Sequence, residues 1–151
     1  MISKYELFSA SVSSLYRDIQ RIERRETAKY GMKGPHAQCL LAMSRYPEGI
    51  TATQICDICE KDKAAVSRTL AELEENGLVL RTERNGSRYR ALLTLTEKGK
   101  DAARTVNEKA QIAVELAGAG LDDAQREIFY AVLDVIAGNL HTICKEGLKD
   151  K

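Results

Sequence analysis

The chain has no tryptophan, and only two phenylalanines and two prolines among its 151 residues. A core with so few aromatic side chains must be mostly aliphatic, and so few prolines disfavour long irregular loops. The chain also has no large excess of charge of either sign, because 23 lysines and arginines are balanced by 22 aspartates and glutamates. A uniformly basic protein that coats nucleic acid is therefore excluded, and any nucleic-acid binding must come from a local patch.

Long hydrophobic runs are absent as well. No uninterrupted apolar stretch approaches the ~18–20 residues of a membrane span, and the first eight residues, with Lys4 and Glu6, are unlike a secretory signal. We therefore expect a cytoplasmic protein with no membrane partner. Its four cysteines are expected to be reduced thiols: Cys39, Cys56, Cys59 and Cys144.

Sequence signatures of catalysis are also lacking. The chain has no P-loop, no dinucleotide-binding glycine motif and no nucleophile elbow. His36 and Cys39 could pair as base and nucleophile, but they lie one helical turn apart and no third orienting residue is evident. We expect no enzyme, no catalytic residue and no cofactor.

The charges that are present are unevenly distributed. Residues 78–100 carry a net charge of +4, whereas residues 101–151 carry a net charge of −3. The middle of the chain therefore attracts anions, and the C-terminal third does not.

Hydrophobic periodicity predicts a mostly α-helical (α+β) fold with one β-hairpin. Thr51 and Gln54 fit a capping box, and Asp62 is the expected N-cap of the following helix. Asn85-Gly86 is a strong hairpin signal between two runs with a period of two. Six helices are expected: at about 4–30, at 35–46, from 51 up to a break at 60–63, from that break to 76, at 97–117, and from about 122 onward. Strands are expected at 78–84 and 89–95.

The fourth predicted helix has two contrasting faces. Val66, Leu70 and Leu73 fall on one side and are expected in the core. The opposite side carries Lys61, Ala64 and Arg68, so its N-terminal half is small and basic and suits entry into the DNA major groove. The alternative is an ordinary amphipathic helix with a solvated charged face.

The hairpin after this helix is basic, because it carries Arg84, Arg88 and Arg90 around a glycine-containing tip. Such a tip can enter the minor groove, whose negative potential favours arginine. Alternatively, the arginines only keep an exposed strand edge soluble. A helix-turn-helix followed by a basic hairpin is a winged helix, and the combination is more specific than either part.

The string VSRTLAELEENGLVLR at 66–81, with Asp62 upstream and LTEKG at 95–99, closely resembles the MarR (multiple antibiotic resistance regulator) family. The resemblance implies a dimeric winged-helix repressor or activator, in which the fourth helix enters the major groove and the wing enters the minor groove. The family wing commonly carries Asp-x-Arg before its second strand, whereas this chain has Ser87 and Tyr89 there.

The resemblance also implies which residues act. DNA contacts are expected from Thr51, Thr53, Lys63, Ala64, Ala65, Ser67, Arg68, Arg84, Arg88 and Arg90. Residues 35–100 would form the DNA-binding domain, and residues 1–34 and 101–151 the helical dimerisation region. The dimer would use two apolar stripes, represented by Phe8, Val12, Leu15, Ile128, Val132, Ile136 and Leu140. Partners would be a pseudo-palindromic operator, a second copy and a small effector lodged between the two regions.

Three other interpretations remain open. The winged helix could contact protein instead of DNA, as a helical interaction module. The spacing of His36, Cys39, Cys56 and Cys59 formally resembles a zinc site, although both pairs fall within predicted helices. Oxidation at Cys144 or at the Cys56–Cys59 pair could regulate the protein, although a disulfide within one helical turn is geometrically awkward.

Overall fold

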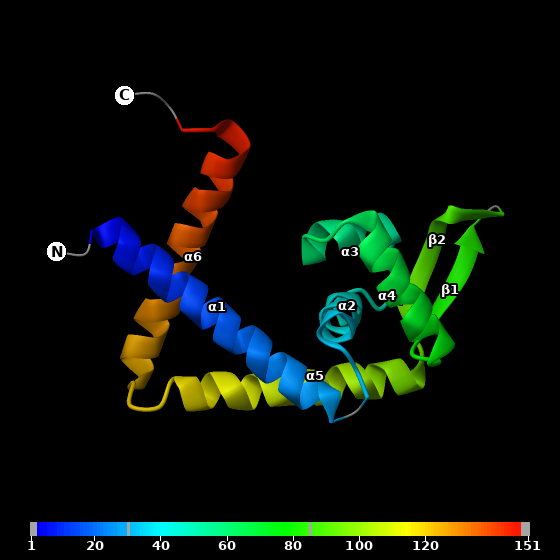
Figure 1. Cartoon of the computed structure of the whole chain (residues 1–151), viewed down its shortest axis with the longest axis horizontal. Helices are drawn as coiled ribbons and strands as arrows, with labels where there is room; N and C mark the ends of the chain where they lie inside the picture. Colours follow the sequence, from blue (N-terminus) through cyan, green and yellow to red (C-terminus); the bar gives the residue numbers. More distant parts are fainter. Residues whose placement is uncertain (1–2, 30, 85, 149–151) are drawn as a thin grey trace. The chain divides into compact units, whose positions relative to one another are not determined.

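The computed structural model describes residues 3–29, 31–84 and 86–148, with the backbone alone at 84 and 87–90 (Figure 1). These residues form six helices and one two-stranded antiparallel sheet. The helices are α1 (Lys4–Ala28), α2 (Gly34–Ser44), α3 (Ala52–Cys59), α4 (Lys63–Glu75), α5 (Glu97–Ala117) and α6 (Asp123–Glu146), and the strands are β1 (Val79–Arg84) and β2 (Ser87–Leu95). The predicted fold class is confirmed.

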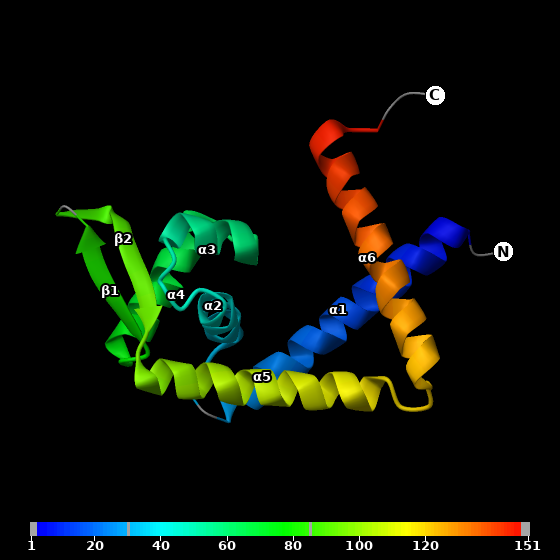
Figure 2. The same cartoon turned by 180° about the vertical axis from the view of Figure 1, so that it is seen from behind.

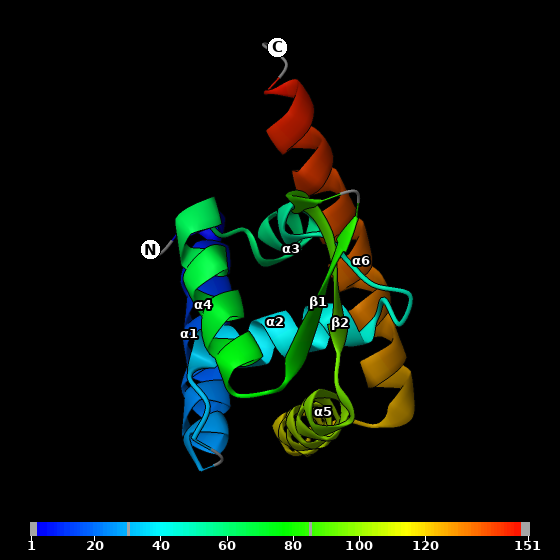
Figure 3. The ribbon, with the colours of Figure 1, turned by 90° about the vertical axis from the view of Figure 1, so that its right-hand side faces the viewer.

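The chain divides into two compact units, Met1–Ala113 and Val114–Lys151. The first unit contains one aliphatic core, in which Leu40, Ile55, Leu70 and Leu93 are fully buried. In all three ribbon views α2 lies between α3 and α5 (Figures 1, 2 and 3). The core therefore joins α2, α3, α4, the sheet and the first turns of α5 into one body.

Local sequence signals explain where the short helices begin and end. The Thr51 hydroxyl accepts a hydrogen bond from the backbone N–H of Gln54 at 3.2 Å, and the Gln54 side chain accepts one from the Thr51 N–H at 2.9 Å. Asp62 accepts from the Ala65 N–H at 2.8 Å. Gly77 follows α4 with φ +70°, a conformation that glycine adopts without strain. The predicted caps are confirmed.

The sheet is the predicted hairpin, with Val79 opposite Leu95 and Arg84 opposite Ser87 (Figure 3). The second strand begins at Ser87, two residues earlier than the sequence predicts. The pairing shifts register between Thr82 and Arg84, so the strands stay paired almost to the turn.

A single hydroxyl group joins the end of β2 to the start of α5. Thr96 Oγ1 donates to the Gly77 carbonyl at 2.7 Å and accepts from the Gly99 N–H at 3.0 Å. The Leu78 carbonyl accepts from the Thr96 N–H at 3.1 Å. The end of α4, the base of the hairpin and the first turn of α5 are therefore tied together.

Gly99→Ala should destabilise this junction severely. A Cβ atom at position 99 would overlap the backbone carbonyl of Leu78, which cannot rotate away as a side chain can. We expect the free energy of unfolding to fall by about 3 kcal/mol or more, measured by urea denaturation. Gly138→Ala is the matched control, because a Cβ there meets nothing within 4 Å of the described structure. An equal loss in both variants would contradict the steric explanation.

Two helices expose apolar faces. On α1 and α6, six of the seven side chains predicted for dimerisation are 42–65% exposed and Ile136 is half-buried. No described residue of α6 is buried. By length and composition alone, α6 is apolar enough to cross a membrane, which corrects the expectation that no segment qualifies. One such helix is weak support for a membrane role, because helices of soluble proteins pass the same test of length and composition.

Candidate nucleic-acid interface

Helix α4 presents the two faces that the sequence predicts. Val66, Leu70 and Leu73 are buried in the core. Of the residues predicted to contact DNA on this helix, Lys63, Ala64, Ser67 and Arg68 are exposed, and Ala65 is half-buried. The N-terminal half of the helix therefore offers a continuous outer surface of small and basic side chains.

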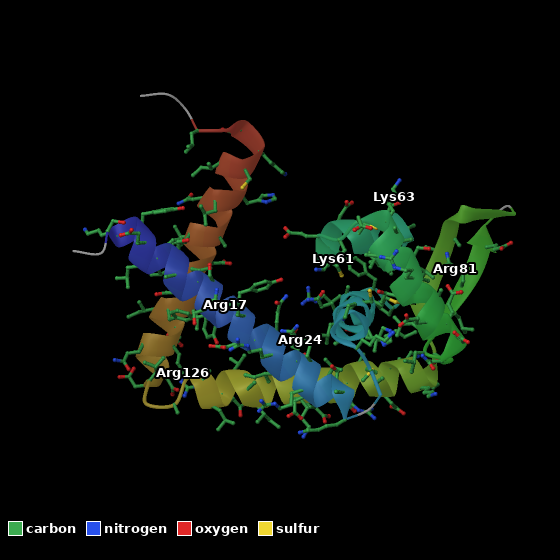
Figure 4. The ribbon with its side chains drawn as sticks, viewed as in Figure 1. Arg17, Arg24, Lys61, Lys63, Arg81 and Arg126 are labelled. Atoms are coloured by element: carbon green, nitrogen blue, oxygen red, sulfur yellow. The ribbon has the colours of Figure 1, made fainter. Side chains whose placement is uncertain are left out.

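Basic side chains gather where α3 turns into α4. Lys61 and Lys63 flank this turn, and Lys63 extends outward from the N-terminal end of α4 (Figure 4). Arg68, just over one helical turn further along, makes no hydrogen bond or ion pair with any residue that the structure describes. Its guanidinium group is thus available to an external acceptor.

The two threonines predicted to contact DNA lie at the start of α3. Thr53 is exposed in the first turn. Thr51 is half-buried, and its hydroxyl both accepts from the Gln54 N–H and donates to Gln54 Oε1 at 3.1 Å. A phosphate at this site would have to share the Thr51 hydroxyl with the helix cap, whereas Thr53 carries no such constraint.

Helix α4 is fixed to α2 through Glu72. Glu72 Oε2 lies 2.7 Å from Nε2 of the buried His36 and 3.0 Å from Nζ of Lys33. Hydrogen bonds from Lys33 and then His36 hold the pKa of the Glu72 carboxyl below its ordinary value. His36 Nδ1 also accepts from the Lys33 backbone N–H at 3.3 Å, so the ring caps α2 as well as bracing α4.

Glu72→Ala should lower the thermal unfolding midpoint, because it leaves the buried His36 Nε2 without an acceptor. Glu75→Ala, an exposed glutamate on the same helix, should leave the midpoint nearly unchanged. Since the Glu72 pKa is lowered by folding, its stabilising effect is complete above the ordinary value of 4.5 and is lost as the pH falls below it. The two variants should therefore converge in acid; a gap that persists there would contradict the role of the charge.

A second ion pair connects α4 to the hairpin. Arg81 Nη2 lies 2.6 Å from Glu74 Oε1, and both side chains are largely sheltered from solvent. Two of the three glutamates in the C-terminal half of α4 are therefore engaged with α2 or β1. This pairing leaves the N-terminal half of the helix to dominate the outward electrostatic field.

The predicted wing arginines, Arg84, Arg88 and Arg90, have side chains outside the described part of the structure. Their backbones belong to β1 and β2, on either side of the hairpin turn. Their contact with DNA stays a prediction.

Sequence reasoning missed the partners of Glu72 and Glu74. Lys33 and His36 lie more than 35 residues from Glu72, and no local pattern links them. The Glu74–Arg81 pair is seven residues apart across a helix end, so charge complementarity between α4 and β1 could have suggested it. The structure gives the zinc interpretation no support, because the described residues contain no group of three or more histidine, cysteine or acidic side chains placed to hold a metal.

A cavity of about 650 Å³ lies in the first unit between α2 and α5. Its apolar wall includes Leu41, Met43 and Ala103, whereas Tyr46 and Arg104 supply polar groups. Arg104 is paired with Asp101 at 2.8 Å, and both side chains are well exposed. Exposed pairs of this kind are weak, so an anionic ligand can compete for the guanidinium group.

Comparisons with known proteins agree with this arrangement. Residues 30–91 match the model of the MarR family. The chain is 26% identical to a MarR transcriptional regulator from Methanosarcina mazei, with 93% of this chain and 94% of that chain covered and a TM-score of 0.82. No curated protein matches the sequence.

Two solved structures share the fold at lower identity. A putative MarR family regulator from Listeria monocytogenes, complexed with 26mer DNA, is 20% identical over 94% of this chain and 96% of that chain, with a TM-score of 0.76. Staphylococcus aureus MarR in complex with salicylate and kanamycin is 22% identical over 91% and 93%, with a TM-score of 0.79.

Proposed function

We propose that this chain, which belongs to the MarR family of transcriptional regulators, binds a pseudo-palindromic DNA operator as a homodimer. In each protomer α4 would lie in the major groove, and the β1–β2 wing would lie in the adjacent minor groove. Because a two-fold dimer matches a two-fold site, the half-sites should lie about 34–36 Å apart, one helical turn. Such a regulator would act in the cytoplasm, where bacterial and archaeal DNA is accessible.

The observation that carries this proposal is the outward face of α4. Ala64 and Ser67 allow close approach to base edges, and Arg68 offers a bidentate donor of the kind that recognises guanine. Glu72 and Glu74 are held by partners on neighbouring elements, which reduces their repulsion of phosphate. This difference between the two halves of α4 would not be required in an amphipathic helix that binds no ligand.

The homodimer rests on the apolar faces of α1 and α6. Stripes that include Phe8, Val12, Val132 and Leu140 stay exposed within their own units. Exposed apolar surface of this extent marks an interaction site. Residues 1–34 and 101–151 would form the dimerisation region, and residues 35–100 the DNA-binding domain.

An effector would bind in the cavity between α2 and α5. Its apolar wall, together with Tyr46, Lys100 and Arg104, suits an amphipathic anion such as an aromatic carboxylate. The Staphylococcus aureus relative with salicylate bound supports this ligand class. Occupation would change the DNA affinity by shifting α5 against α2.

The test is selection of duplexes from a random pool, followed by titration of the selected duplex at about 50 and 200 mM salt. We expect a two-fold-related consensus and an affinity that falls steeply with salt, because phosphate contacts release counterions. Adding salicylate should change the affinity. Absence of salt-dependent duplex binding would favour a module that contacts protein instead.

A further inference from the structure

Helix α4 ends in a turn that satisfies carbonyls inside the helix and leaves those of the turn itself to other elements. The Gly77 N–H donates to the Glu74 carbonyl at 3.0 Å, and the Leu78 N–H donates to the Leu73 carbonyl at 2.9 Å. The carbonyls of Asn76 and Gly77 lie beyond the last helical residue, so no N–H group of α4 can reach them. Their donors must come from outside the helix.

The start of α5 supplies these donors (Figures 1 and 3). Lys98 Nζ donates to the Asn76 carbonyl at 2.9 Å, and Thr96 Oγ1 donates to the Gly77 carbonyl at 2.7 Å. The Thr96 N–H donates to the Leu78 carbonyl at 3.1 Å. Lys98 is the only charged donor in these three bonds, and among the described residues it forms no ion pair that would draw its ammonium group elsewhere.

The charge of Lys98 suits this position. The C-terminal end of a helix carries a partial negative charge that favours a cation, yet the last turn of α4 contains no basic residue. Cations reach the C-terminal half of α4 from three other elements instead. Lys33 of α2 pairs with Glu72, and Arg81 of β1 pairs with Glu74. Lys98 of α5 reaches the end of the helix, so it is the charged contact that joins α4 to α5.

We propose that Lys98 is a positioning residue for DNA recognition, which holds α4 at the angle at which its N-terminal half enters the major groove. This role rests on the proposed function. Helix α4 is 13 residues long, and a stiff rod of this length converts a small tilt at one end into a displacement of the side chains near the other. Lys98 thus acts through the backbone of α4 and makes no contact with DNA itself.

The experiment compares Lys98→Met with Lys98→Arg in the full chain, using the selected duplex. Lys98→Met removes the ammonium group and keeps a long side chain, so the affinity should fall about threefold to tenfold. The loss is limited because the bond is exposed and water competes for the carbonyl. Lys98→Arg keeps a charged donor and should stay within about twofold of wild type. Lys109→Met is the matched control, because it removes the same charge from an exposed position further along α5, and it should also stay within about twofold.

The salt dependence of binding distinguishes positioning from direct contact. A lysine that contacts a phosphate contributes about one unit to the slope of log affinity against log salt concentration, so its loss flattens that slope. Lys98→Met should weaken binding and leave the slope unchanged. A flatter slope, an unchanged affinity or an equal loss in Lys109→Met would overturn the proposal.

Amide hydrogen exchange in the absence of DNA tests the cap directly. The N–H groups of Asn76, Gly77 and Leu78 should exchange faster in Lys98→Met than in wild type, and Lys98→Arg should restore their protection. Exchange rates that do not change in Lys98→Met would also overturn the proposal. If the wild-type protein bound no duplex, the proposed function would fail, whereas the exchange rates would still decide whether Lys98 fixes the end of α4.

Discussion

Arg68→Ala should weaken binding to the selected duplex about 10- to 100-fold, the effect expected when a bidentate base contact is removed. The guanidinium group is exposed on the outer face of α4 and has no partner within the described residues. Its removal should therefore leave folding intact while it removes a contact to DNA. Fluorescence anisotropy with labelled duplex measures the loss.

Arg21→Ala is the matched control for Arg68→Ala. Arg21 is an exposed arginine on α1 whose side chain pairs only with Asp18 at 3.3 Å among the described residues. Its loss removes the same charge from the chain without touching α4, so it should change affinity less than about threefold. Equal effects of the two variants would show that Arg68 acts only through net charge. Arg68→Ala, but not Arg21→Ala, should also discriminate less between the selected duplex and a duplex with a substituted half-site.

The second large effect is expected from the double substitution Val132→Asp and Leu140→Asp. Both side chains are exposed on α6 within the apolar stripe assigned to dimerisation. Carboxylates cannot be buried there without a partner, so the homodimer should dissociate. Light scattering coupled to size-exclusion chromatography should report a monomer. Affinity for the two-half-site duplex should fall by about a factor of 100 or more, because the second half-site no longer binds intramolecularly.

Asn139→Asp adds a carboxylate to the same helix at an exposed polar position and should leave the protein dimeric. The double variant should still bind a single half-site with nearly the affinity of one wild-type protomer, because α4 and the wing are unchanged. A dimer that survived both charges would contradict the assignment of α6. A monomer that kept full affinity for the complete operator would contradict the need for two copies.

Most of the fold could be predicted from local sequence signals. The N-caps at Thr51 and Asp62 lie where the sequence predicts them, because each depends on residues within four positions. The buried face of α4 could also be predicted from the sequence, because helical periodicity alone places Val66, Leu70 and Leu73 on one side.

The contacts that hold the candidate site together could not be predicted from the sequence. Glu72 meets Lys33 and His36 across 36 to 39 residues, and Cys39 and Cys59, on two different helices, line the same cavity. Such pairs depend on how helices cross, and a single sequence contains no periodicity that encodes a crossing. Spacing therefore suggested Cys56 as the neighbour of Cys59, whereas the packing of α2 against α3 places Cys39 and Cys59 on the wall of one cavity.

The Thr96 hydroxyl has a mechanical consequence for regulation. It lies one residue from Leu95 and four from Lys100, both of which line the cavity between α2 and α5, and it bonds to groups on either side of the hairpin base. Under the proposed function, a ligand that displaced the first turn of α5 would also displace the base of the hairpin and the end of α4, because this one hydroxyl bonds to both Gly77 and Gly99. The two elements that are proposed to enter the DNA grooves would then be displaced together by the movement of a single helix.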